Sequence, residues 1–77
     1  MELKQVLTDI ARAIVDNPDA VNVVENVDGN DVVLVLTVAE SDTGMVIGRH
    51  GRIAKAIRQV MKAAANTCGK HVNVVIE

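Results

Sequence analysis

The segment Gly48-Arg49-His50-Gly51 combines two glycines with two side chains that can carry positive charge. Glycine allows a sharp turn and, because it lacks a Cβ atom, it lets a ligand approach the backbone closely. Arg49 and His50 lie between the glycines and Arg52 follows them, so cationic donors surround the turn. A helix starting near Arg52 would also point its first amides and the positive end of its dipole at the loop. The spacing therefore predicts a site that binds phosphate groups.

Apolar residues stand on both sides of this loop. Val46 and Ile47 precede it, and Ile53 and Ala56 follow it. We expect them to form an apolar floor beside the loop, with Lys55 adding a cation on the same helix. A cationic loop beside an apolar floor suits a sugar-phosphate strand whose bases turn inward.

Two helical segments must hold this loop, and the sequence predicts both. The polar run Glu40–Thr43 contains residues that favour helix N-caps, so a turn or two of helix fits residues 44–47. A long helix follows from about Arg52 to Thr67, and Gly69 suits its C-cap. The predicted apolar stripe of this helix comprises Ile53, Ile57, Val60, Met61, Ala64 and Cys68. The opposite arc comprises Arg52, Lys55, Arg58, Gln59 and Lys62. Whether Arg58 and Lys62 contact the ligand stays open from the sequence.

The first half of the chain predicts a helix and a hairpin. Apolar residues recur at helical spacing from Leu3 to about Asp16, and Pro18 should end that helix because proline disfavours helical geometry in the residue before it. Val21–Val27 and Val32–Ala39 are rich in β-branched residues and predict two strands, with a turn at Gly29 between them.

The second of these strands is apolar on both faces, so we place it at the centre of a sheet. Glu25 interrupts the apolar face of the first strand, which a bulge or a fraying edge would explain, and His71–Glu77 predicts a third strand. The order helix, strand, strand, helix, helix, strand predicts an α+β fold with helices on one face of a three-stranded mixed sheet. The strands on either side of the helix pair can run parallel through a right-handed crossover.

Composition excludes several classes of protein. The chain has no Phe, Tyr or Trp, whereas an RRM or a cold-shock domain stacks bases on aromatic side chains. Cys68 is the only cysteine and the two histidines lack neighbouring ligands, so we expect no disulfide, metal or other cofactor. No set of acid, base and nucleophile is discernible, so an enzyme is not expected. The apolar stretches are too short and interrupted for a membrane span, and we expect a cytoplasmic protein.

Charge is divided unevenly along the chain. Residues 1–47 hold two basic and nine acidic residues, a net charge of −7, whereas residues 48–77 hold six basic residues and one acidic residue, a net charge of +5. Such asymmetry indicates a local anion-binding surface on an otherwise acidic body, although pairing within the molecule would also account for it.

The loop and its surroundings resemble the KH domain, whose signature is an Ile-Gly-X-X-Gly loop between two helices. The order of elements is similar to the type II KH arrangement, and the likeness covers residues 1–77 as one domain. The run from Gly48 to Arg58 is most similar to the small stand-alone bacterial KH-domain proteins. His50 departs from the commoner Lys, Arg or Gln of the loop. The resemblance implies RNA contacts from Ile47, Gly48, Arg49, His50, Gly51, Arg52, Ile53, Lys55 and Ala56.

Two functions remain open from the sequence. The first is binding of single-stranded RNA, which the family uses in RNA chaperones and post-transcriptional regulators. The second is a KH scaffold for protein interactions, since the family implies a homodimer and pairing with a second, larger KH-containing protein. Val33, Val35 and Val75 on the uncovered face of the sheet are candidates for such an interface.

Overall fold

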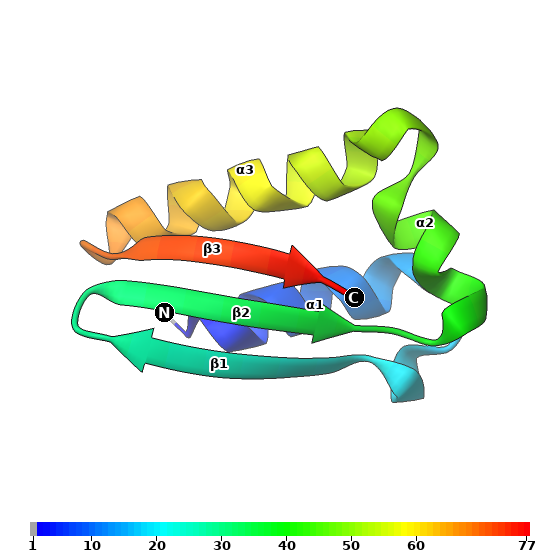
Figure 1. Ribbon diagram of the computed structural model, residues 1–77, viewed down its shortest axis with the longest axis horizontal. Coiled ribbons are helices and arrows are strands. Elements are labelled where there is room, and N and C mark those ends of the chain that lie inside the picture. The colour runs from blue at the N-terminus through cyan, green and yellow to red at the C-terminus, as the bar shows by residue number, and fades with distance from the viewer. Residues whose placement is uncertain (1) are drawn as a thin grey trace.

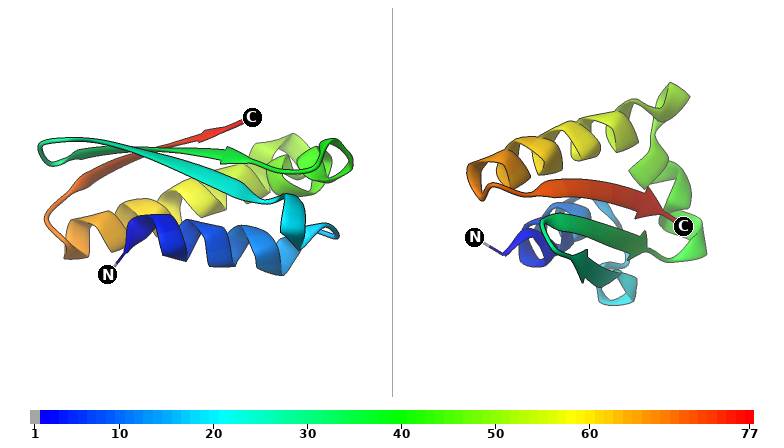
Figure 2. Two further views of the ribbon diagram at one scale, coloured as in Figure 1. Left: turned by 90° about the horizontal axis from the view of Figure 1, so that it is seen from below. Right: turned by 60° about the vertical axis from the view of Figure 1, so that its left-hand side comes forward.

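The β-branched segments pair into a three-stranded sheet with the order β1-β2-β3. The computed structural model describes residues 2–77, and in it the strands are β1 (Asn22–Asp28), β2 (Asp31–Thr37) and β3 (His71–Ile76). β1 and β2 are antiparallel, β2 and β3 are parallel, and all helices lie on one face of the sheet (Figures 1 and 2). The central place of the second strand and the parallel pairing across the helices are confirmed.

The hairpin between β1 and β2 has an uninterrupted register from Asn22↔Thr37 to Asp28↔Asp31. Gly29 has a φ of 61°, as the first central residue of a type II′ turn requires. Because the register is uninterrupted, a bulge at Glu25 is excluded. Glu25 is exposed on the helix-facing side because β1 is an edge strand whose buried residue is Val23 alone.

Three helices frame the sheet: α1 (Leu3–Ile14), α2 (Thr43–Ile47) and α3 (Arg52–Thr67). Short 3-10 turns precede β1 at Pro18–Ala20 and precede α2 at Glu40–Asp42. α3 has the bounds expected from the sequence, whereas α1 ends two residues earlier because Val15 is already extended. None of the helices within residues 2–77 is long and apolar enough to cross a membrane.

The core lies between the sheet and the helices. β2 contributes most to it, with Val32, Leu34 and Leu36 almost fully buried. The helices bury Leu3, Leu7, Ala11, Val46, Ala54, Ile57, Met61 and Ala65. The face alternation expected for β2 and β3 is confirmed, since Val74 is buried and its neighbours on that face are partly buried.

The expected apolar stripe of α3 is wrong at two positions. Ile53 is 40% exposed and Val60 is 51% exposed, whereas Ala54 and Ala65 are buried. α3 packs against both β3 and α1, and small alanines allow the helix to approach its neighbours closely. The larger Ile53 therefore lies at the margin of the packed surface of α3, where it is partly exposed, and Ala54 takes the buried place.

Asp42 is the only buried charged residue among residues 2–77, with 1% of its surface exposed. Its carboxylate accepts hydrogen bonds from the backbone N–H of Asn17 at 2.9 Å, the Asn17 side-chain amide at 3.1 Å and the backbone N–H of Asp16 at 3.4 Å. Because Asp42 directly precedes α2, these bonds fix the end of α1 against the start of the helix that leads into the loop.

Candidate nucleic-acid interface

Gly48 ends α2 and begins the loop. Its backbone N–H donates to the Gly44 carbonyl at 2.8 Å, and its φ of 73° with a ψ of 177° is a conformation that other residues rarely adopt. A Cβ atom at this position would lie 2.7 Å from Cγ1 of Ile53, closer than real side chains pack. Glycine is therefore required here both by the backbone and by the isoleucine of α3.

The tip of the loop, Arg49–Gly51, is a 3-10 turn that presents the side chains of Arg49 and His50 to solvent. His50 has a φ of 57°, the only positive φ among the non-glycine residues of the described chain. Gly51 follows with a φ of 72° and donates its N–H to the Gly48 carbonyl at 3.3 Å. Two consecutive left-handed residues thus turn the chain into α3 and leave the tip exposed.

The N-terminus of α3 opens directly onto this tip. Gly51 is the N-cap and provides no side-chain hydrogen bond to the first turn, and that turn contains no acidic residue. The Arg52 amide donates to the Arg49 carbonyl, whereas no capping side chain covers the amides that follow it in this 16-residue helix, and the Arg52 side chain is exposed beside them. The arrangement can hold a phosphate group between the helix end and the cationic tip.

α3 has a basic flank that faces β3. The Nε of Arg58 donates to the Val74 carbonyl at 3.3 Å, which joins the middle of the helix to the edge strand. Lys55 and Lys62 lie three residues before and four residues after Arg58, so they share its flank. The sequence left Arg58 undecided because its spacing alone did not show which neighbour the basic arc faces.

The β3 edge beside this flank carries backbone groups that are not bonded to the sheet. The N–H groups of His71 and Glu77 donate to Asn30 and Leu36, so alternate residues of β3 bond to β2. The residues between them, among them Val74, direct their N–H and C=O away from the sheet. The loop, the basic flank of α3 and the edge of β3 therefore adjoin one another on one side of the molecule (Figure 1).

The opposite flank of α3 is apolar and faces α1. There a hollow of about 410 Å³ is lined by Ile10, Ile14, Arg52, Ile53, Ala56, Ile57 and Val60. Of the residues expected as an apolar floor beside the loop, Ile53 and Ala56 line this hollow, Val46 is buried in the core, and Ile47 is 41% exposed at the end of α2. The structure thus divides the expected floor among the hollow, the core and the end of α2.

The two-layer αββααβ arrangement, with a Gly-X-X-Gly loop between α2 and α3, is that of a type II KH domain. The sequence profile of the KhpA/KhpB KH domain matches residues 4–76, and the chain belongs to this family. The family is one of KH-domain RNA-binding proteins and not of enzymes.

Named relatives agree over nearly the whole chain. The RNA-binding protein KhpA of Clostridium acetobutylicum is 51% identical over 74 residues, which cover 96% of this chain and 99% of that protein. The RNA-binding protein KhpA of Bacillus subtilis is 39% identical and covers 96% and 91% of the two chains. A crystal structure of an Aquifex aeolicus Era variant aligns with 99% of this chain and 31% of its own, at a TM-score of 0.58 and 18% identity, a likeness of fold.

Proposed function

We propose that residues 1–77 act as one KH domain that binds single-stranded RNA through the loop Gly48–Gly51. The observation that carries this proposal is the exposed cationic tip, held by left-handed glycines at the open N-terminus of α3. The sugar-phosphate backbone would lie on the loop, where no Cβ atom blocks its approach at either glycine. The printed names of the relatives, RNA-binding protein KhpA, support the same ligand.

The two flanks of α3 support one path for the bases. From the loop, a strand can continue over the basic flank formed by Lys55, Arg58 and Lys62, beside the open edge of β3. Ile47, exposed next to Gly48, offers an apolar contact at the start of that path. Recognition without aromatic residues is compatible with bases that lie against aliphatic side chains and backbone groups.

The loop is tested by replacing Arg49 and His50 together with aspartate. An arginine and a histidine, both hydrogen-bond donors, then become carboxylates that face a phosphate, so RNA affinity should fall by about a thousandfold. The melting temperature should hardly change, because both positions are exposed. Fluorescence polarisation with a labelled single strand measures the affinity, and circular dichroism measures the fold.

The matched control is Lys70→Asp, at the opposite end of α3 from the loop, which should weaken binding only slightly. For the parent protein, a slope of log affinity against log salt of about −1.5 to −3 corresponds to two to four phosphate contacts. Normal RNA binding by the folded double variant would disprove the loop as the binding site. We further propose a role as an RNA chaperone or post-transcriptional regulator in the bacterial cytoplasm, a proposal supported by the printed names of the bacterial relatives as RNA-binding proteins.

A second candidate function is self-association through the apolar hollow between α1 and α3. Ile14, Ile53 and Val60 are exposed there, whereas Val33 and Val35 of the sheet face are partly buried. Two copies related by a two-fold axis can place their hollows against each other. A homodimer of this kind, or pairing with a second, larger KH-containing protein, would bury the hollow.

A further inference from the structure

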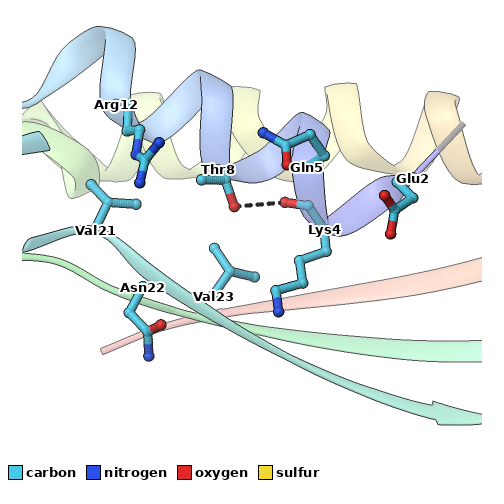
Figure 3. Close-up of a pocket in the computed structure, with 8 residues that line it drawn as sticks. All are labelled: Glu2, Lys4, Gln5, Thr8, Arg12, Val21, Asn22 and Val23. Carbon is cyan, nitrogen blue, oxygen red and sulfur yellow. Dashed lines mark hydrogen bonds between the residues drawn. The ribbon is translucent and has the colours of Figure 1, made fainter. Parts of the chain in front are cut away.

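A second hollow lies on the other side of α1, between this helix and the edge strand β1 (Figure 3). Its volume is about 330 Å³. Lys4 and Arg12 reach into it from α1, and Asn22 borders it from β1. The buried side chains of Val21 and Val23 form its floor. Glu2 stands at one end of the lining.

The two cations of this hollow are exceptional in their half of the chain. Lys4 and Arg12 are the only basic residues among residues 1–47, which also hold nine acidic residues. Among the lining residues drawn in Figure 3, neither of these side chains forms a hydrogen bond. Thr8, which lies between them along the helix, donates its hydroxyl to the Lys4 backbone carbonyl. Two like charges thus line one hollow, with the Glu2 carboxylate at its end.

The backbone of β1 is unpaired beside the same hollow. Asp28 and Asp31 flank a two-residue turn and form a hydrogen-bonded pair, and bonded pairs alternate with unbonded ones along an antiparallel ladder. Val23 therefore falls opposite Leu36 as an unbonded pair. The Leu36 carbonyl does face away from β1, since it accepts the N–H of Glu77 beyond β3. Val23 and Glu25 consequently direct their N–H and C=O groups to the open edge.

The surrounding charge selects the class of ligand. Three acidic residues are exposed along or beside β1, namely Asp19, Glu25 and Asp28. They would repel the phosphates of a nucleic-acid strand on either side of the two cations. A polypeptide strand with a single acidic side chain avoids this repulsion and can pair with the free edge. It would add to β1, at the edge of the sheet opposite to β3 and the candidate RNA surface.

We propose that β1 and the hollow beside it bind an extended segment of another protein by strand addition. The main chain of that segment pairs with Val23 and Glu25, and one of its carboxylates lies between Lys4 and Arg12. Main-chain bonds at an exposed edge give affinity, while pockets for alternate side chains give specificity. This site goes beyond RNA binding and does not depend on the loop.

The probe is an eight-residue peptide of alternating valine and threonine with one central glutamate and a lysine at each end. Titrated into the isotope-labelled protein, it should shift the NMR signals of the Val23 and Glu25 amides and slow their hydrogen exchange. The same peptide with glutamine in place of glutamate should bind about tenfold more weakly, because the charge-assisted bonds are lost. Lys4→Gln combined with Arg12→Gln should weaken binding of the glutamate peptide equally and leave single-stranded RNA binding unchanged.

Three results would overturn the proposal. The first is the absence of shifts at Val23 and Glu25 with the glutamate peptide at millimolar concentration. The second is equal binding of the glutamate and glutamine peptides, a comparison that uses the unaltered protein and does not rely on any variant folding. The third is a loss of RNA affinity in the Lys4→Gln, Arg12→Gln protein, which would assign the hollow to the nucleic acid instead.

Discussion

Gly48 and His50 adopt positive φ angles in the same loop for different physical reasons. At Gly48 both the backbone and the contact with Ile53 exclude a side chain. His50 adopts its positive φ although it carries a side chain, and a left-handed histidine costs about 1–2 kcal/mol relative to a right-handed one. The turn at the two glycines could be predicted from the sequence because glycine is the residue type that allows such a turn. The conformation of His50 could not, since it follows from how the turn joins α2 to α3.

The two glycines of the loop should respond differently to alanine. Gly48→Ala adds a Cβ atom that collides with Ile53, and it places alanine in a backbone conformation that only glycine adopts readily. It should therefore destabilise the fold by about 2–4 kcal/mol. Gly51→Ala meets no atom within 4 Å and incurs only the left-handed backbone cost of about 1–2 kcal/mol. Urea unfolding of both variants measures the difference. Equal losses would show that the Ile53 contact does not restrict Gly48.

At the scale of the elements, the long helix was predicted with its bounds but not with its rotation. α3 begins at Arg52 and ends at Thr67, as expected, because Gly51 and Gly69 mark both ends in the sequence. The buried face was misjudged because hydrophobicity favours Ile53 and Val60, whereas packing against α1 and β3 buries small Ala54. The flank that faces β3 is known only from the Arg58 bond.

Arg58 should contribute directly to RNA affinity. We expect Arg58→Gln to lower affinity about five- to tenfold and to reduce the salt slope by about 0.7, the value for one phosphate contact with a single strand. The Arg58 side chain is exposed, so stability should change by no more than about 1 kcal/mol. Gln59→Ala, on the next position of the helix, serves as the control. An unchanged affinity for Arg58→Gln would move the RNA path away from β3.

Asp42 illustrates an interaction between distant elements that local sequence patterns do not reveal. In the sequence it belongs to a polar run before α2, whereas in the structure it is buried and bonded to residues at the end of α1. Asp42→Ala leaves the N–H of Asn17 without its acceptor, so we expect a loss of about 2–4 kcal/mol in unfolding free energy. For a chain of this size that lowers the melting temperature by at least about 8 °C.

The control for Asp42 is its exposed neighbour Ser41, whose hydroxyl oxygen lies 3.4 Å from the Asn17 side-chain amide. Ser41→Ala should change the unfolding free energy by no more than about 0.5 kcal/mol. Similar melting temperatures for Asp42→Ala and the parent protein would show that the buried bonds do not hold α1 against α2.

At the scale of the whole molecule, the topology could be predicted because strand alternation, turn residues and element order all indicate one arrangement. The pairing order β1-β2-β3 follows from the apolar residues on both faces of β2. The division of the molecular surface could not be predicted. It depends on which sides of α1 and α3 face each other, and hence on the two hollows and the exposed edges that flank them.

Val60 provides the test of self-association. The parent protein should form a homodimer at micromolar concentration, and Val60→Lys should remain a monomer of 8.2 kDa, because a lysine in the α1–α3 hollow would be buried without a partner. Val60 is 51% exposed in the single chain, so the substitution should not impair folding. Sedimentation equilibrium over a range of concentrations measures the mass.

Val24→Lys, at a 47% exposed position on the uncovered face of the sheet, is the matched control and should still dimerise. If Val24→Lys is the monomer and Val60→Lys the dimer, the interface is the sheet face that carries Val35 and Val75, and the hollow between the helices is not the contact surface.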